Sequence, residues 1–174
     1  MFKEESSMEY VTLNNGLKMP MEGFGVFQVP DPAQCEQAVL DAIASGYRLI
    51  DTAAAYMNEK SVGEAVKKCG VPRGELFITT KLWIQDAGYE EARKAIRRSL
   101  DNLGLDYLDL YLIHQPMGDY IGAYRAMEEA YKEGKLRAIG VCNSEGRKTI
   151  SIVFYNTFSE KENIIPDKST ETNY

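Results

Sequence analysis

Four polar side chains that can move a proton follow separate apolar segments of the chain. Asp51 ends the RLID segment, Tyr56 lies five residues further on, Lys81 follows FITT and His114 follows LYLI. A phenol has an ordinary pKa of ~10, and a nearby ammonium lowers it by stabilising the phenolate. We expect Asp51 to hold Lys81 charged and oriented, and His114 to hydrogen-bond a bound carbonyl or the phenol. Such a set suits protonation of a developing alkoxide by Tyr56.

Each of these residues also has a purely structural interpretation. Asp51 alone is typical of a cap or loop acceptor, and Tyr56 alone of a packed aromatic with a solvated hydroxyl. Lys81 fits a solvated strand end, and His114 fits a hydrogen-bonded interior histidine. All four residues lie at the ends of successive apolar segments. If there were no site here, four separate structural interpretations would all have to be correct. The pattern therefore favours a site.

The cysteine and histidine content restricts other chemistries. Cys35, Cys69 and Cys142 are odd in number and far apart, without a CxxC spacing, which indicates free thiols in a reducing compartment. His114 is the only histidine, so a multi-histidine metal site is excluded and no metal is expected. The same histidine would have to serve as base for Cys142 or Ser144, and no local motif supports either nucleophile.

Length and composition indicate one globular domain. The chain has 174 residues, of which 44% are hydrophobic and 26% charged. Its net charge of -6 gives no reason to expect a nucleic-acid partner. No apolar run reaches the roughly 18 residues that a membrane span needs. The N-terminal MFKEESSMEY has acidic residues and no apolar core, which predicts no signal peptide and a cytoplasmic location.

Strand and helix patterns alternate along the chain and must position the four side chains. An Asn-Gly pair between apolar residues at 11–19 predicts a β-hairpin, and GFGVFQV predicts a short strand. Helical patterns cover 31–46, 59–70, 89–104 and 120–134, and strand patterns cover 48–53, 75–83, 107–116 and 136–143. This order predicts a parallel sheet covered by helices, in which the carboxyl ends of the strands share one face.

Two architectures fit this alternation, a doubly wound sheet and a (β/α)8 barrel. The first strand-to-helix turn, FQVPDPAQ, has no GxGxxG phosphate loop. Its absence argues against a dinucleotide-binding doubly wound sheet.

Long segments of the chain resemble the aldo-keto reductases. GYRLIDTAAAYMNEKSVGEA (46–65) is similar to the first signature of that family, and LDNLGLDYLDLYLIHQP (100–116) to the second. FITTKLW, GFGVFQV and the N-terminal hairpin also fit, and the resemblance runs from Tyr10 to Asn143. It implies an α/β fold of the (β/α)8 TIM-barrel type with an N-terminal β-hairpin. It also implies NADPH-dependent reduction of small aldehydes and ketones to alcohols, as in bacterial reductases of methylglyoxal and diketogluconate.

The resemblance assigns roles to individual residues. The catalytic tetrad of the family matches Asp51, Tyr56, Lys81 and His114. Tyr56 would be the general acid, which Lys81 and Asp51 tune, and His114 would orient the substrate carbonyl.

Further residues match the ligand contacts of the family. The cofactor set matches Gly25, Val26, Phe27, Asp51 and Asn143, with Asn143 at the nicotinamide carboxamide. Cys142 replaces the usual serine neighbour of that asparagine. The substrate set matches Trp83, Phe27 and His114.

The resemblance ends after Asn143. A complete barrel takes about 250 residues, so we expect an incomplete one, with about five strands and four helices in 1–143 and a divergent, partly disordered tail in 144–174. TISIVFYNTF in that tail predicts a β-rich run, and Lys168-Ser169-Thr170 is faintly similar to the cofactor-phosphate segment of the family.

Three explanations fit this ending: a frameshift or deletion just after Asn143, a fragment that completes its sheet by self-association, or a divergent closure. The abruptness of the change favours the first. An open sheet leaves an unpaired edge at LRAIGVCN (136–143), which favours self-association unless TISIVFYNTF covers it. The alternative function is therefore an inactive truncated fragment, or a self-associating module that lacks most of the cofactor site.

Overall fold

A five-stranded parallel sheet forms the centre of the protein. The computed structural model describes residues 8–143. Within them the sheet order follows the chain: β3 (Gly23–Gly25), β4 (Leu49–Asp51), β5 (Phe77–Leu82), β6 (Leu110–Ile113) and β7 (Ile139–Val141). Every neighbouring pair is parallel, and the hairpin strands β1 (Tyr10–Thr12) and β2 (Lys18–Pro20) pair separately.

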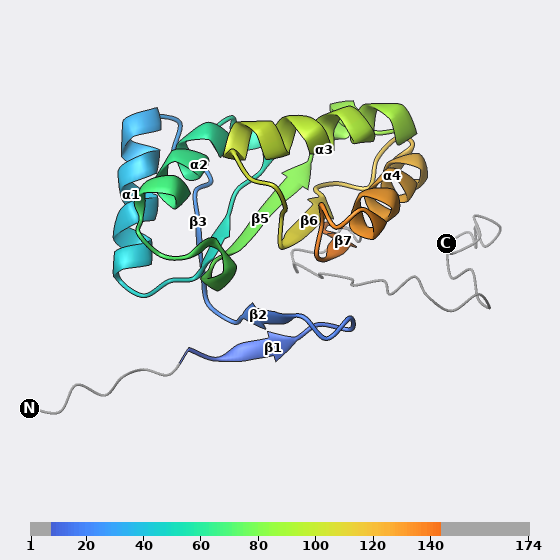
Figure 1. Ribbon diagram of the computed structural model, residues 1–174. Coiled ribbons are helices and arrows are strands. Elements are labelled where there is room, and N and C mark those ends of the chain that lie inside the picture. Colours follow the sequence, from blue (N-terminus) through green and yellow to red (C-terminus); the bar gives the residue numbers. More distant parts are fainter. Residues whose placement is uncertain (1–7, 144–174) are drawn as a thin grey trace, which may run out of the picture.

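One helix follows each of the first four strands of the sheet. These helices are α1 (Pro32–Ala44), α2 (Glu59–Lys68), α3 (Tyr89–Leu103) and α4 (Tyr120–Lys132). Figure 1 shows them side by side in one layer over the sheet, with the hairpin on the other side. A strand order without reversal and helices on a single face are features of a barrel wall, whereas a doubly wound sheet carries helices on both faces. The described residues thus form part of a (β/α)8 barrel, with the expected five strands and four helices.

The helix boundaries follow local sequence signals. At the start of α1, Asp31 accepts a hydrogen bond from the Gln34 amide at 2.8 Å, and Pro32 occupies the first helical position. Helix α3 ends at Gly104, whose φ of 64° is in the left-handed region that glycine tolerates. Its buried face contains Ala92, Ala95, Ile96, Ser99, Leu100 and Leu103, which confirms the helical pattern in this segment.

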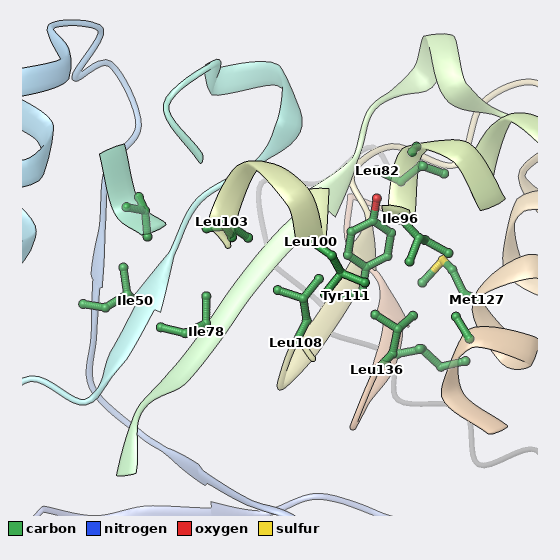
Figure 2. Close-up of a cluster of buried hydrophobic side chains, with 14 of the residues drawn as sticks. Ile50, Ile78, Leu82, Ile96, Leu100, Leu103, Leu108, Tyr111, Met127 and Leu136 are labelled. Atoms are coloured by element: carbon green, nitrogen blue, oxygen red, sulfur yellow. The ribbon is translucent and has the colours of Figure 1, made fainter. Parts of the chain in front are cut away.

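The pleat of the strands separates two cores. Side chains such as Ile50, Ile78 and Tyr111 point toward the helices and pack with Leu100 and Met127 (Figure 2). On the opposite face, Phe77, Leu110, Leu112, Ala138 and Cys142 pack against Leu13 of the hairpin segment. Successive side chains of a strand alternate between faces, so each site residue on a strand is assigned to one core or the other by its position.

The hairpin loop contains three residues rather than the Asn-Gly pair alone. The Gly16 amide donates to the Leu13 carbonyl at 2.9 Å, and the Leu13 amide donates to the Leu17 carbonyl at 2.8 Å. Gly16 has a φ of 83°, the left-handed conformation that completes a three-residue hairpin loop. Asn15 also donates to the Arg137 carbonyl at 2.8 Å, which attaches the hairpin to the segment before β7.

Short 3-10 turns follow two of the strands that matter for the site. Turn η1 (Ala54–Tyr56) follows β4, and turn η3 (Ile84–Asp86) follows β5; a third turn, η2 (Arg73–Glu75), precedes β5.

No helix among residues 8–143 is both long and apolar enough to cross a membrane. TISIVFYNTF and Lys168-Ser169-Thr170 lie outside the described residues.

Close packing of α2 against α3 generates a stability prediction at Gly63. A Cβ at this position would meet the Leu103 backbone, whose carbonyl carbon would lie only 2.7 Å away. We expect Gly63→Ala to lower the free energy of unfolding by about 1–3 kcal/mol because the backbone cannot yield without moving a helix. Gly74→Ala is the matched control, since its Cβ would have no neighbour within 4 Å. Urea unfolding of both variants checks this, and equal stabilities would contradict the packing described.

Candidate active site

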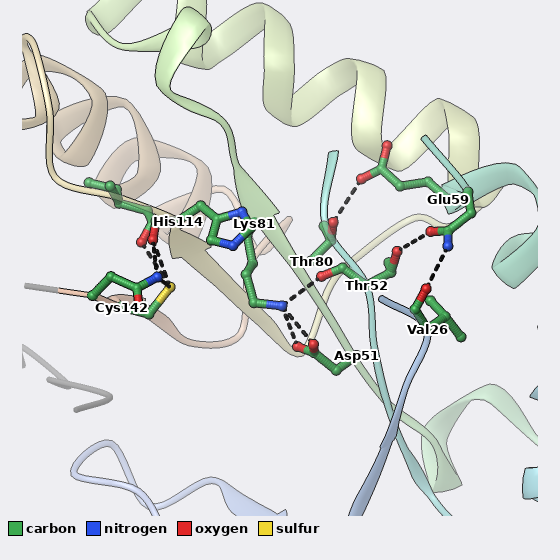
Figure 3. Close-up of polar contacts among 11 residues, drawn as sticks. Val26, Asp51, Thr52, Glu59, Thr80, Lys81, His114 and Cys142 are labelled. Carbon is green, nitrogen blue, oxygen red and sulfur yellow. Dashed lines mark hydrogen bonds and ion pairs between the residues drawn. The ribbon is translucent and has the colours of Figure 1, made fainter. Parts of the chain in front are cut away.

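The Lys81 ammonium lies buried between β4 and β5, where it meets the carboxylate of Asp51. Lys81 Nζ donates to the two carboxylate oxygens at 2.7 and 2.6 Å and to the Thr52 carbonyl at 2.9 Å (Figure 3). Because β4 and β5 are adjacent and parallel, the pleat directs both side chains to the same face. Lys81 is only 8% exposed, so the interpretation as a solvated strand end is wrong, and Asp51 pairs with this lysine instead of capping a turn.

Tyr56 reaches the pair because η1 turns the chain back over the end of β4. Its amide donates to the Ala53 carbonyl at 2.9 Å, and the following Met57 has a φ of 58°, which ends the turn. Lys81 Nζ lies 5.3 Å from the centre of the Tyr56 ring, a cation–π distance. The rings of Phe27 and His114 lie 5.0 and 5.8 Å from the ring of Tyr56.

His114 directly follows β6 and faces the same end of the sheet. Its ring packs edge-on against Tyr56 and, at 5.2 Å, against Trp83. Burial and the positive charge of Lys81 lower the pKa of His114 to about 4. The imidazole is therefore uncharged at neutral pH. Its Nδ1 atom is buried and has no hydrogen-bond partner among the described residues.

The pKa of Tyr56 moves in the opposite direction from that expected. Burial raises it, and the negative charge of Asp51 adds to the increase. The expected net lowering is absent because burial has the largest effect on this pKa. The three N–H donors of Lys81 are directed at Asp51 and Thr52 rather than at the phenol. Burial also raises the pKa of Asp51, against the opposing effect of Lys81.

The residues matched to the cofactor and substrate lie around Tyr56, Lys81 and His114, but the side chain of Val26 points away from them. Gly25 is exposed, with open space where a Cβ would stand, and Phe27 is 64% exposed. Trp83 is half-buried beside His114. Val26 is fully buried in the helix-side core, so only its backbone faces the site.

Asn143 lies two residues after the end of β7. It is exposed, has a φ of 55°, and its Nδ2 donates to the His114 carbonyl at 2.8 Å. Cys142 Sγ contacts the same carbonyl at 3.1 Å, and burial raises the pKa of this thiol. The two residues thus connect the end of β7 to His114.

Two pairs of buried polar residues that the sequence did not single out lie near the strand ends, and only the Thr52–Asn58 pair is connected to Lys81. Thr52 and Asn58 are 0 and 3% exposed and hydrogen-bond to each other at 2.7 Å. On the helix side of β5, Thr80 donates to the buried carboxylate of Glu59 at 2.8 Å. The only signal for these residues in the sequence was that they are polar residues within or beside mostly apolar segments.

Comparisons with known proteins identify the family. A profile of the aldo/keto reductase family matches residues 22–168, and the chain belongs to this family. Glyoxal reductase from Bacillus subtilis (strain 168) is 52% identical over 139 residues, which cover 79% of this chain and 50% of that protein. The chain spans about half the length of the curated relatives it matches.

Solved structures agree with this assignment. An aldo/keto reductase from Brucella melitensis superposes with a TM-score of 0.78 at 43% identity, covering 80% of this chain and 55% of that one. Bombyx mori aldo-keto reductase in complex with NADP gives a TM-score of 0.73 at 37% identity, covering 77% and 50%. The predicted family and barrel fold are confirmed. The family match continues beyond Asn143, and the division of the chain at that residue stays a prediction.

The environment of His114 gives a direct prediction, since the chain has one histidine. We expect its imidazole NMR signals to titrate with a midpoint near pH 4, and those of the urea-unfolded chain near the ordinary value of about 6.5. Between these values the unfolded state binds more protons. The contribution of His114 therefore disfavours the folded state increasingly as pH falls from about 6.5 to 4. A native midpoint between pH 6 and 7 would contradict the burial described.

Proposed function

We propose that this chain reduces aldehydes and ketones to alcohols with NADPH and that Tyr56 is the general acid. The observation that carries the proposal is the placement of the Tyr56 ring beside the buried Lys81, which pairs with the half-buried Asp51, and against His114. Membership of the aldo/keto reductase family and the NADP complex of one structural neighbour support it.

The raised pKa of Tyr56 keeps the phenol protonated in the free protein. The phenol stays protonated at neutral pH and can transfer its proton when negative charge develops on the substrate oxygen. The phenolate that remains would then lie beside the Lys81 ammonium, which stabilises negative charge. Asp51 keeps that ammonium charged and in place, so it acts through Lys81.

The uncharged imidazole of His114 suits the orientation of the substrate carbonyl. A neutral imidazole has one N–H donor and does not compete with Tyr56 as an acid. Its ring is held between those of Tyr56 and Trp83, so a carbonyl oxygen bonded to His114 would lie close to the phenol. We assign Trp83 and Phe27 to the walls of the substrate pocket.

The residues at the end of the sheet fit a nicotinamide cofactor. Gly25 leaves open space, Phe27 presents an exposed ring, and Asn143 presents an exposed amide near His114. Val26 would contribute only its backbone, and Asp51 would act through Lys81. Bound NADPH would supply a hydride to the carbonyl carbon. The chain supplies the placement of the substrate and the proton.

We propose small carbonyl compounds as substrates. Glyoxal reductase is among the relatives, and glyoxal is therefore the first compound to test, followed by methylglyoxal.

Three free cysteines support the further proposal of a cytoplasmic location.

Removal of the Tyr56 hydroxyl tests the proposal. We expect wild-type protein to oxidise NADPH in the presence of glyoxal or methylglyoxal, and Tyr56→Phe to lower kcat by about 10²–10⁴, the usual worth of a general acid. Tyr47→Phe is the matched control, because Tyr47 lies before β4, at the other end of the strand from Tyr56, and is 37% exposed. Absorbance of the reduced nicotinamide follows the reaction. Equal rates for wild type and Tyr56→Phe would refute the role of Tyr56.

The edge strand β7 supports a second candidate function. In the described part of the chain, β7 pairs with β6 alone, and an unpaired strand edge is a template for association. The alternative proposal is an inactive, self-associating chain. Light scattering that shows a defined dimer, together with no NADPH binding by calorimetry, would favour it. A monomer that reduces glyoxal would reject it.

A further inference from the structure

Asn58 occupies the cap position of α2 but its side chain does not cap that helix. Its backbone carbonyl accepts from the Val62 amide, whereas its side chain makes no hydrogen bond to the first turn of α2. Asparagine at this position usually bonds to the free amides of the helix. At 3% exposure, the side chain is instead directed across the structure.

The Asn58 amide group holds the loop between β3 and α1. Its Nδ2 donates to the Val26 carbonyl at 2.9 Å and to the Val29 carbonyl at 3.2 Å. The two carbonyls lie on either side of Phe27 and Gln28. The backbone of Gln28 has a φ of 60°, which residues other than glycine rarely adopt. The Asn58 bonds therefore maintain an unfavourable backbone in the loop that places the Phe27 ring 5.0 Å from that of Tyr56.

The same side chain reaches the lysine through Thr52. Thr52 Oγ1 donates to Asn58 Oδ1 at 2.7 Å, and the Thr52 carbonyl accepts from Lys81 Nζ at 2.9 Å. Figure 3 shows this series of bonds from Val26, past Thr52, to Lys81 and Asp51. Asn58 also follows Tyr56 by two residues, which places its side chain close along the chain to the phenol that the site uses.

We propose that Asn58 is a positioning residue that fixes the 26–29 loop, Tyr56 and Lys81 in one arrangement. The inference rests on the proposed function for its kinetic consequence only. Asn58 bonds the 26–29 loop directly and is connected to Lys81 through Thr52, so cofactor affinity and proton donation both depend on a single buried amide. Loss of the amide would release the loop while the helices and sheet stay assembled.

The test uses Asn58→Leu, which keeps the number and branching of the side-chain heavy atoms, and Thr52→Val, which replaces the hydroxyl donated to Asn58 by a methyl group. Thr80→Val is the matched control, because Thr80 is equally buried and its hydroxyl donates to the next residue of α2, Glu59, on the helix side. Thr52→Ser keeps the hydroxyl that donates to Asn58 and should therefore behave as wild type. If Asn58→Leu does not fold, the Thr52 pair decides the outcome.

The first readout needs no cofactor and no turnover. The single histidine, His114, packs against the ring of Tyr56 and against that of the single tryptophan, Trp83. We expect Asn58→Leu and Thr52→Val to move the imidazole NMR signals and the tryptophan fluorescence of the folded protein, and Thr80→Val to leave both unchanged. This result is independent of whether the chain reduces carbonyls.

The second readout is the split between binding and turnover. We expect Asn58→Leu to raise the KM for NADPH on the order of tenfold, as expected for the loss of hydrogen bonds that order a binding loop, and to lower kcat as well. Thr80→Val should lower stability and leave both constants as in wild type. Variants of Asn58 and Thr52 that lose stability, but keep the His114 and Trp83 signals of wild type, would overturn the proposal.

Discussion

The burial of the Lys81 ammonium is the constraint on which the rest of the site depends. A charge removed from water is costly unless it is paired and hydrogen-bonded, and Asp51 and Thr52 provide all three acceptors. The pairing fixes the end of β4 against β5 and leaves no lysine donor for the phenol. Burial keeps Tyr56 protonated, and burial together with the positive charge of Lys81 keeps His114 uncharged.

The parallel sheet makes this arrangement attainable from separate parts of the sequence. Alternation along each strand sends Ile50 and Ile78 into the helix-side core and Asp51 and Lys81 to the other face. A shift of one residue in the pairing would exchange these faces and bury the charges among apolar helices. The packing of the apolar core thus determines the register that brings the polar groups together. The hairpin covers the other end of the same face, through Leu13 against Phe77 and Leu110.

The sequence predicted the fold and the convergence of the four polar residues because strand ends of a parallel sheet meet at one edge. It predicted the sign of the Tyr56 pKa shift wrongly, because that sign is set by how deeply the phenol is buried and by its distance from Asp51. The direction of the Asn58 side chain was also beyond prediction, since its position before α2 is typical of a helix cap. Val26 matched a ligand-lining segment, but its side chain packs in the core because alternation along that segment turns it inward.

The central claim is that the buried lysine supports proton donation in carbonyl reduction. It is tested most directly by NADPH oxidation with glyoxal in wild type and in the variant with both Lys81→Met and Asp51→Asn, which removes the paired charges without leaving either one buried alone. The account predicts turnover by the wild type and a loss of about 10² or more in kcat in the folded double variant. Turnover by the folded double variant at the wild-type rate would contradict it.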